Sequence, residues 1–180
     1  MQTVSIDITK AKAIDGWMSE PELVWLAEKS IEHRCIVEIG SFLGRSTRAM
    51  LDHTQGVVYA IDDWKGPRDV YMSKEERSML YTKFLCNVMD EHLRYLTHLK
   101  IVQADHKSVC LNIIPDMVFI DGSHEYEDVS YDISLWSKLI QRGGLLCGHD
   151  IDTQGVWQAV TELLGDVDVV DNTSIWYKIV

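Results

Sequence analysis

Two glycines four residues apart, Gly40 and Gly44, constrain the fold of this chain more than any other feature. The apolar run Cys35–Val37 before them is typical of a buried strand, and Ser46–Leu51 after them has the pattern of a helix. A strand that ends in a glycine turn and opens a helix lets the backbone approach a ligand and directs free N–H groups toward it. A tight turn without a ligand fits equally well, so the motif alone leaves both alternatives open.

Strand and helix patterns alternate along the chain. Short apolar, β-branched runs predict parallel strands at residues 35–39, 57–61, 99–104, 117–120 and 145–148. Helical patterns predict helices that start at Ser46 and that span 74–98, 107–114, 125–141 and 155–164. Two last strands, 167–170 and 174–180, are joined by a turn too short for a crossover and must be antiparallel. We therefore predict an α/β fold with a doubly wound, mostly parallel seven-stranded sheet, an antiparallel last strand and helices on both faces.

The length of 180 residues favours a single domain, 1–180. We expect an N-terminal helical segment, 1–33, and a core, 34–180. Ser19 and Glu22 have the spacing of a capping box, so a helix is expected to begin there. We expect that helix to cover an edge of the core and to border a ligand site.

The bulk composition is that of an ordinary globular protein, with 46% hydrophobic and 25% charged residues. The formal net charge of −11 disfavours nucleic acid and anionic membranes as partners, because both need clustered Lys and Arg. We find no signal-peptide pattern at the start and no apolar run long enough to span a membrane. The four cysteines form no Cys-x-x-Cys pair and are expected to be reduced, mostly core residues. We predict a cytoplasmic protein and leave a homo-oligomer open.

Acidic residues mark the end of every predicted parallel strand. They are Glu38, Asp62, Asp105, Asp121 and Asp150. A single acid after a strand is usually a turn former or a helix cap. Ligands of open parallel sheets, however, bind beyond the carboxyl ends of the strands. Five carboxylates at this one edge therefore predict a ligand site.

Five motifs occur in a fixed order along the chain. They are the glycine loop in Val37–Gly44, then Tyr59–Asp62, Gln103–Asp105, Phe119–His124 and Gly143–Asp150. Over about residues 17–180 this order resembles a class I S-adenosylmethionine-dependent methyltransferase, which implies a Rossmann-like fold. The Asp-Gly-Ser-His and Gly-His-Asp signatures are similar to the small family-24-type methyltransferases. These are related to metal-assisted O-methyltransferases such as the catechol and macrolide-sugar enzymes.

The resemblance implies that S-adenosyl-L-methionine binds at this edge. Gly40 would approach the methionine part of the cofactor, where a side chain would collide. Glu38 would lie near the cofactor amino group or order the glycine loop. Asp62 would accept hydrogen bonds from the ribose hydroxyls, and Asp105 with the backbone near His106 would hold the adenine. The remaining residues predicted to bind the cofactor are Ser41, Gly44, Ser46, Asp63, Trp64 and Asp121.

Three of the side chains near this edge have two interpretations each. The Trp64 ring either stacks on the adenine or belongs to the core. The hydroxyls of Ser46 and Thr47 either cap the helix or reach the cofactor carboxylate, with capping slightly favoured for Thr47.

The reaction implied by the resemblance is O-methylation of a small molecule or sugar. The enzyme must place an acceptor oxygen in line with the methyl group and remove its proton. Asp121 and His124 are the predicted catalytic residues. His124 is expected to be a general base, a ligand, or a residue that caps or hydrogen-bonds at a helix start. Asp121, His149 and Asp150 are the predicted ligands of a divalent metal such as Mg²⁺. His149 departs from the metal-dependent pattern, which has an acid or Asn there, and would suit a softer ion or none.

Two other functions stay open on the residues. A nicotinamide-dependent oxidoreductase shares the fold, although Gly-x-Gly-x-x-Gly is missing from the glycine loop. A non-catalytic module that binds S-adenosylmethionine would carry the same cofactor residues. Binding of NAD(H) without affinity for S-adenosylmethionine would favour the first, and binding without turnover would favour the second.

Overall fold

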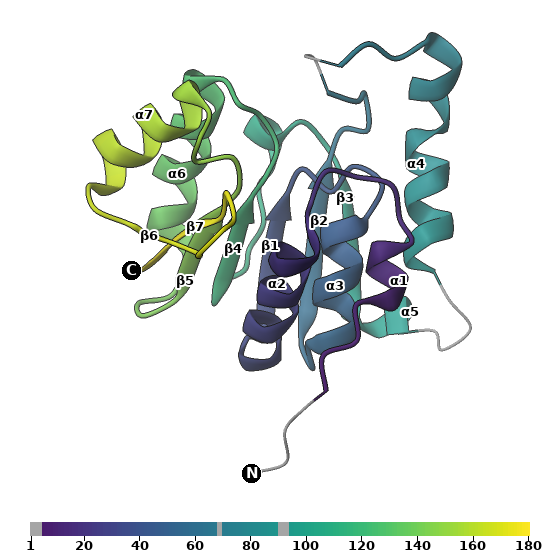
Figure 1. Ribbon diagram of the computed structural model, residues 1–180, viewed down its shortest axis with the longest axis horizontal. Helices are drawn as coiled ribbons and strands as arrows, with labels where there is room; N and C mark the ends of the chain where they lie inside the picture. Colours follow the sequence, from purple (N-terminus) through teal and green to yellow (C-terminus); the bar gives the residue numbers. More distant parts are fainter. Residues whose placement is uncertain (1–4, 68–69, 90–93) are drawn as a thin grey trace.

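A seven-stranded sheet in the order β3-β2-β1-β4-β5-β7-β6 forms the centre of the computed structural model, which describes residues 5–67, 70–89 and 94–180 (Figure 1). The parallel strands are β1 (Cys35–Ile39), β2 (Val57–Asp62), β3 (Leu99–Gln103), β4 (Met117–Ile120) and β5 (Leu145–Gly148). The short β6 (Asp168–Val169) and β7 (Trp176–Ile179) pair antiparallel, and β7 is also antiparallel to β5. The predicted fold class is confirmed.

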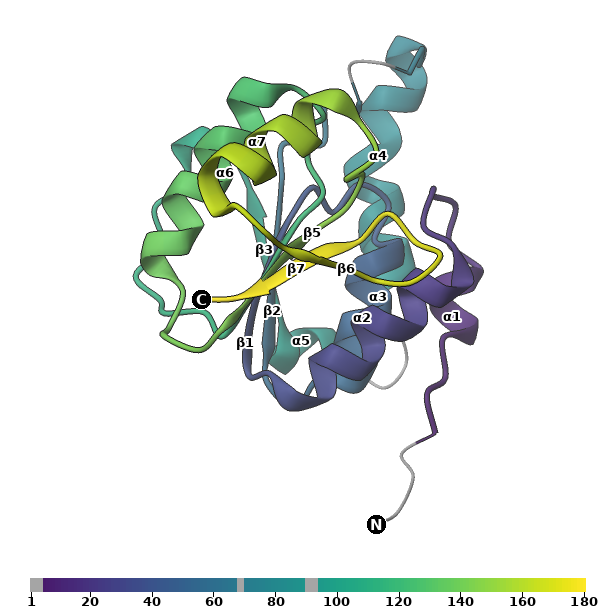
Figure 2. The same ribbon diagram turned by 60° about the vertical axis from the view of Figure 1, so that its left-hand side comes forward.

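Helices cover both faces of the sheet (Figure 2). One face carries α1 (Thr9–Lys12), α2 (Glu20–Glu32), α3 (Arg45–His53), α4 (Lys74–Val88) and α5 (Arg94–His98). The other carries α6 (Tyr126–Leu139) and α7 (Gln154–Leu164). Within the described residues, no helix has the length and apolar character that crossing a membrane requires.

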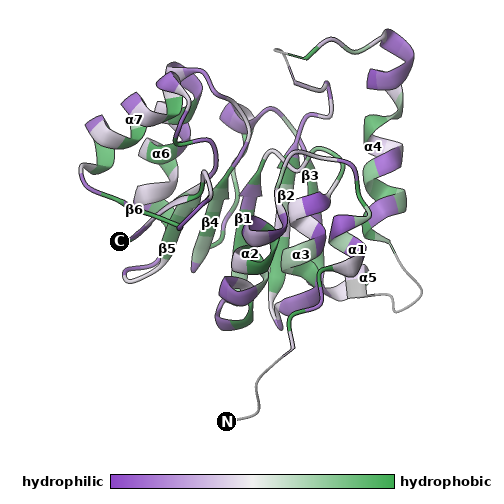
Figure 3. Ribbon diagram, viewed as in Figure 1, coloured by the Kyte–Doolittle hydropathy of each residue, from purple (hydrophilic) through white to green (hydrophobic). Residues whose placement is uncertain are grey.

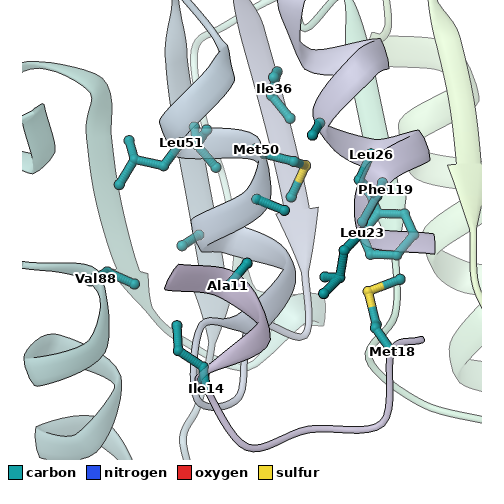
Figure 4. Packing of buried hydrophobic residues seen from close by; sticks show 14 of the residues in the cluster. Ala11, Ile14, Met18, Leu23, Leu26, Ile36, Met50, Leu51, Val88 and Phe119 are labelled. Carbon is teal, nitrogen blue, oxygen red and sulfur yellow. The ribbon is translucent and has the colours of Figure 1, made fainter. Parts of the chain in front are cut away.

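Each face of the sheet has its own apolar core. Leu23 and Leu26 of α2 pack with Met50 of α3 and Phe119 of β4 on one face (Figure 4). On the other face, Trp136 of α6 lies in the second cluster, together with the strand residues whose side chains point to that face. Strand residues thus contribute to both cores, which explains the near-continuous hydrophobic runs of the central strands. These strands are largely green in Figure 3. Each fully buried leucine contributes roughly 2 kcal/mol to folding.

The order of the strands determines where a ligand crevice opens. β1 pairs with β2 on one side and with β4 on the other, so consecutive crossovers run in opposite directions from β1. This reversal is a topological switch point, and ligands bind there beyond the carboxyl ends of the strands. Gly40 follows β1 and Asp121 follows β4, so both lie at the switch point.

The helix predicted over 107–114 is wrong. Only a 3-10 turn, η1 (His106–Ser108), forms, and the described residues 109–115 contain no helix. Val109, Leu111 and Ile113 pack against the second core, while the residues between them are exposed. This alternation with period two belongs to an extended segment, and the β-branched side chains favour it over a helix.

Three further expectations need correction. The predicted helix 74–98 is two helices, α4 and α5, with residues 90–93 outside the described part of the chain. α1 was not placed within the expected N-terminal helical segment, and the strand expected over 167–170 is reduced to β6.

The prediction for the cysteines also needs correction. All four are free thiols, but Cys86 and Cys110 are exposed because they lie outside the packed faces. The division into segments 1–33 and 34–180 stays a prediction.

Candidate active site

A cleft of about 700 Å³ lies at the carboxyl edge of the sheet. It gathers most of the residues predicted for the site, namely Gly40, Ser41, Ser46, Asp62, Asp63, Asp105, His106, Asp121, His124, His149 and Asp150. Glu38, Gly44 and Trp64 do not line it. The structure therefore separates residues that face the cleft from residues that support its walls.

Glu38 supports the glycine loop (Gly40–Gly44) from below. Its carboxylate is fully buried and accepts hydrogen bonds from the hydroxyls of Ser41 at 2.6 Å and Ser46 at 2.5 Å, and also from Thr47. Of its two interpretations, ordering the loop is therefore the one that the contacts fit. Burial raises the pKa of Glu38. The Ser46 and Thr47 hydroxyls do not cap the helix, because both point to this carboxylate.

The two glycines serve different purposes. Both have left-handed backbone, with φ of 87° at Gly40 and 89° at Gly44. A Cβ at Gly40 would overlap the Asp121 carbonyl oxygen and lie 2.5 Å from the Gly122 Cα, so the close approach of two strand ends requires glycine there. Gly44 is instead the N-cap of α3, and a Cβ there would lie 2.7 Å from Val88 in the core. Gly44 does not line the cleft, and its predicted place at the cofactor stays a prediction.

Asp62 fixes two turns at the end of β2. Its carboxylate accepts the N–H groups of Phe42 at 2.8 Å and Trp64 at 2.6 Å, and both residues have positive φ, 44° and 51°. Burial raises the pKa of Asp62. The Trp64 ring is only 4% exposed and packs against Tyr81 and Phe84. Of its two interpretations, the core is therefore the one that the contacts fit, and stacking on the adenine stays a prediction.

The end of β3 carries a second polar cluster. Asp105 accepts the N–H of Lys107 at 2.9 Å, and His106 Nδ1 lies 2.7 Å from the buried Asp132 of α6. This hydrogen bond raises the pKa of His106. Asp128, one turn before Asp132, lies 2.5 Å from the Lys107 ammonium. Neither acid of α6 was predicted, although their spacing beside the apolar stripe of an amphipathic helix is a signal.

Asp121, His149 and Asp150, which we call the ligand triad, come together at the ends of β4 and β5. Each offers one donor atom, and these atoms lie within 4.8 Å of one another. His149 Nδ1 is 3.1 Å from Asp150 Oδ2 and 3.7 Å from Asp121 Oδ1. Burial raises the pKa of Asp121 to about 8. Burial would lower the pKa of His149, but its bonds to Asp150 and Glu22 and the charge of Asp121 raise it to about 10.

His124 lies beside the ligand triad, two residues before α6. Its Nε2 is 2.9 Å from Asp150 Oδ2, and its side chain is 48% exposed. The pairing of an imidazole with a carboxylate orients the ring, as in other acid–base sites. This contact fits the predicted alternative of a hydrogen-bonding residue near the helix start, and the roles of general base and ligand stay predictions.

The family model Methyltransf_24, described as a methyltransferase domain, matches residues 37–151, which is more than half of the chain. The chain belongs to this methyltransferase family. The resemblance to class I methyltransferases found in the sequence is thereby confirmed at the level of the family.

The relatives compared with this chain share little sequence identity with it. "Uncharacterized protein R132" of Acanthamoeba polyphaga mimivirus is 24% identical over 138 residues, which span 73% of this chain and 59% of that protein. CalS11, a calicheamicin methyltransferase, shares 12% identity with a TM-score of 0.66 over 87% of this chain and 76% of its own. The O-methyltransferase from Bacillus cereus in complex with SAH shares 14% identity with a TM-score of 0.64 over 94% and 86%. These structures share the fold.

The ligand triad of the methyltransferase fits a divalent ion. Two carboxylates and one imidazole nitrogen converge, a set of oxygen and nitrogen atoms that metal sites use. The other ring nitrogen of His149, Nε2, lies 3.0 Å from Glu22 Oε1 of α2. Metal-ligating histidines usually donate their other ring N–H to a carboxylate, a backbone carbonyl or water. Glu22 was predicted only as a helix cap, and its wider role has no local sequence signal.

Two further segments line the cleft. The first is residues 15–18, and the second is the loop after β2, through Asp63, Lys65, Gly66 and Pro67. Trp17 is 65% exposed, and its ring centroid lies 5.0 Å from that of Phe42 in the glycine loop. Arg45 Nε donates to the Met18 carbonyl at 2.9 Å and so fastens the first segment to α3. An exposed aromatic wall of this kind offers a stacking surface to a ligand ring.

Proposed function

We propose that the methyltransferase transfers a methyl group from S-adenosyl-L-methionine to a hydroxyl of a small molecule or sugar, assisted by a divalent metal. The observation that carries this proposal is the convergence of the ligand triad beside the glycine loop in one cleft. Family membership supports the methyl transfer, and the structure of the Bacillus cereus O-methyltransferase with SAH supports the cofactor.

The glycine loop and the β2 end are proposed to bind the cofactor. When bound, the cofactor supplies an electrophilic methyl group. Gly40 and Ser41 offer backbone at close range, because the support by Glu38 holds the loop in place. Asp62 retains acceptor capacity for ribose hydroxyls, since each carboxylate oxygen accepts more than one hydrogen bond. His106, oriented by Asp132, is proposed to hold the adenine together with Asp105.

His124 is the proposed general base. Imidazole is suited to proton transfer near neutral pH, and His124 lines the cleft next to the ligand triad. Asp150 would orient the ring and stabilise the imidazolium that forms when the acceptor proton arrives.

The ligand triad would hold the metal ion. A divalent ion there would lower the pKa of an acceptor hydroxyl. Burial raises the pKa of the Asp121 carboxyl, and neighbouring acids add to this effect. A cation at this position would favour the ionised form of Asp121. The chain would thus supply two carboxylates and one imidazole to the ion.

The charges in the cleft favour an uncharged or cationic acceptor. The acidic side chains that line it are Asp15, Asp62, Asp63, Asp105, Asp121, Glu125, Asp128, Asp132 and Asp150. The basic ones are Arg45, Lys65 and Arg77. Arg77 donates to the carbonyls of Lys65 and Pro67, and Lys65 pairs with Asp63 at 2.9 Å.

This excess of carboxylates in the cleft would repel phosphate esters. CalS11 is described as a TDP-rhamnose 3'-O-methyltransferase, and we propose that nucleotide-linked sugars of that kind are poor acceptors here.

Methyl transfer tests the proposal. Purified protein with isotope-labelled S-adenosylmethionine is offered catechols, free sugars and amino sugars, with Mg²⁺, with Mn²⁺ and with EDTA. We expect transfer to a hydroxyl that EDTA reduces. Turnover that survives EDTA would contradict metal assistance, and cofactor binding without any turnover would favour the non-catalytic module. The family assignment leaves the nicotinamide-dependent alternative without support. We also propose a cytoplasmic location, since all four cysteines are free thiols.

A further inference from the structure

In the part of the chain that the structure describes, α2 and α4 both begin with a capping box, and the two capping glutamates differ in burial. In α4, Glu76 accepts the N–H of Ser73 at 2.8 Å and remains exposed. In α2, Glu22 accepts the N–H of Ser19 at 2.7 Å, yet it is only 5% exposed. Helix capping therefore does not require the burial of the glutamate. Burying a carboxylate costs free energy, so the second one needs another explanation.

The contacts of the two Glu22 oxygens supply that explanation. Oε2 accepts both bonds from Ser19, the N–H and the hydroxyl at 2.8 Å, and completes the helix cap. Oε1 points the other way, to the N–H of Ser174 at 3.1 Å and to His149 Nε2 at 3.0 Å. One carboxylate thus joins α2, the end of β5 and the segment before β7.

These contacts fix the orientation of the His149 ring. An ionised carboxylate only accepts hydrogen bonds, so Nε2 must carry a proton. The Ser174 hydroxyl, 3.0 Å from Nε2 and 3.3 Å from Glu22 Oε1, donates to Glu22 and accepts from the same ring proton. With Nε2 bound in this way, Nδ1 is the ring nitrogen that faces Asp150 and Asp121.

We propose that Glu22 is a positioning residue that holds a proton on His149 Nε2 and so turns Nδ1 toward the carboxylates of the ligand triad. This inference rests on the proposed function, because the ring that it positions is a metal ligand there. It also assigns the first turn of α2 to the site. A substitution that disturbs this helix start would therefore change the affinity of the ligand triad for a metal ion.

Histidine NMR tests the inference without a metal. In protein labelled with ¹⁵N-histidine, we expect a protected, downfield Nε2–H signal, assigned by its loss in His149→Gln. Glu22→Ala weakens the protection and shifts the signal upfield, because only the neutral Ser174 hydroxyl remains as acceptor. Glu22→Gln retains the signal because the amide oxygen still accepts. Ser174→Ala keeps the signal, since Glu22 remains. Glu76→Ala, which removes the other capping glutamate, leaves it unchanged. An unprotonated Nε2 in the wild type, or the same signal in Glu22→Ala, would overturn the inference.

Mn²⁺ titration of the metal-free protein gives a second readout. We expect Glu22→Ala to bind Mn²⁺ about 10- to 100-fold more weakly than the wild type, as for other carboxylates behind a ligating histidine. Glu76→Ala should bind as the wild type does. Equal Mn²⁺ affinity in Glu22→Ala would overturn the inference. If the wild type binds no Mn²⁺, the metal part of the proposed function fails, and the NMR signal still decides the role of Glu22.

Discussion

The two halves of the cleft are built in opposite ways. The cofactor half is shaped by backbone, and its buried carboxylates, Glu38 and Asp62, are bonded to hydroxyls and N–H groups of neighbouring residues. The reacting half is made of side chains, and its carboxylates, Asp121 and Asp150, face each other across His149. The first half is complete without a ligand. The second brings two carboxylates to one point, where a cation would favour the ionised form of Asp121, whose pKa is raised mainly by burial. The cleft therefore has a preformed side, which is the cofactor half, and a side that its ligand completes, which is the reacting half.

The largest effect is expected at the support of the preformed side. Glu38→Ala would leave the hydroxyls of Ser41, Ser46 and Thr47 buried without their acceptor. We expect the free energy of unfolding to fall by about 3 kcal/mol or more and cofactor binding to be lost. Urea denaturation measures the first, and calorimetry with S-adenosylhomocysteine the second. Glu28→Ala, an exposed site on α2, is the control. Stability within about 0.5 kcal/mol of the wild type would contradict the role of Glu38.

The next effect concerns the side that the ligand completes. Asp121→Ala combined with Asp150→Ala removes both carboxylates of the ligand triad but leaves the glycine loop and Asp62 in place. We expect turnover to fall about 1,000-fold or more while affinity for S-adenosylhomocysteine stays within about threefold. A methyl-transfer assay and calorimetry on the same preparation measure the two. If this variant and EDTA both leave turnover intact, the metal assignment is wrong.

Asp62→Ala probes the preformed side again, with a smaller effect than Glu38→Ala on the fold. It removes the proposed ribose acceptor and the two backbone bonds that hold Phe42 and Trp64. We expect affinity for S-adenosylhomocysteine to fall by about 100-fold or more, beyond calorimetric detection. Exposed Asp171→Ala serves as the control. Unchanged affinity would remove the ribose assignment.

The smallest effect is a pH dependence at the adenine end. The hydrogen bond with Asp132 raises the pKa of His106 above its ordinary value of 6.5. Its contribution to folding is therefore complete below about pH 6.5 and is lost as the pH rises through the higher folded-state pKa. His106→Asn keeps a donor to Asp132 but does not titrate. We expect wild type minus variant stability to be about 1 kcal/mol larger at pH 6 than at pH 9 by urea denaturation. A constant difference would show that the pair does not titrate.

The contrast between the two halves also explains what the sequence predicts well. The strands, the sheet class and the cleft edge follow from local patterns, because buried strands are apolar and each ends in an acid. The glycine loop and its supports lie within ten residues of one another, so its position followed from the motif.

Contacts between segments that are far apart in the sequence could not be predicted from local patterns. Glu22 and Ser174 meet His149 only because α2 and the segment before β7 pack against the end of β5. Gly44 shares its motif with Gly40, yet its missing side chain makes room for α4 rather than for a ligand. Residues 107–114 were predicted as a helix but are largely extended, because a short apolar run does not reveal its period until a partner surface selects it.

The division of the cleft is tested most directly by calorimetric titration of S-adenosylhomocysteine into the wild type, once in EDTA and once in Mn²⁺. We predict one molecule bound per chain with the same dissociation constant in both, because the cofactor half is complete without the metal. Binding that depends on Mn²⁺, or no binding in either condition, would contradict the account.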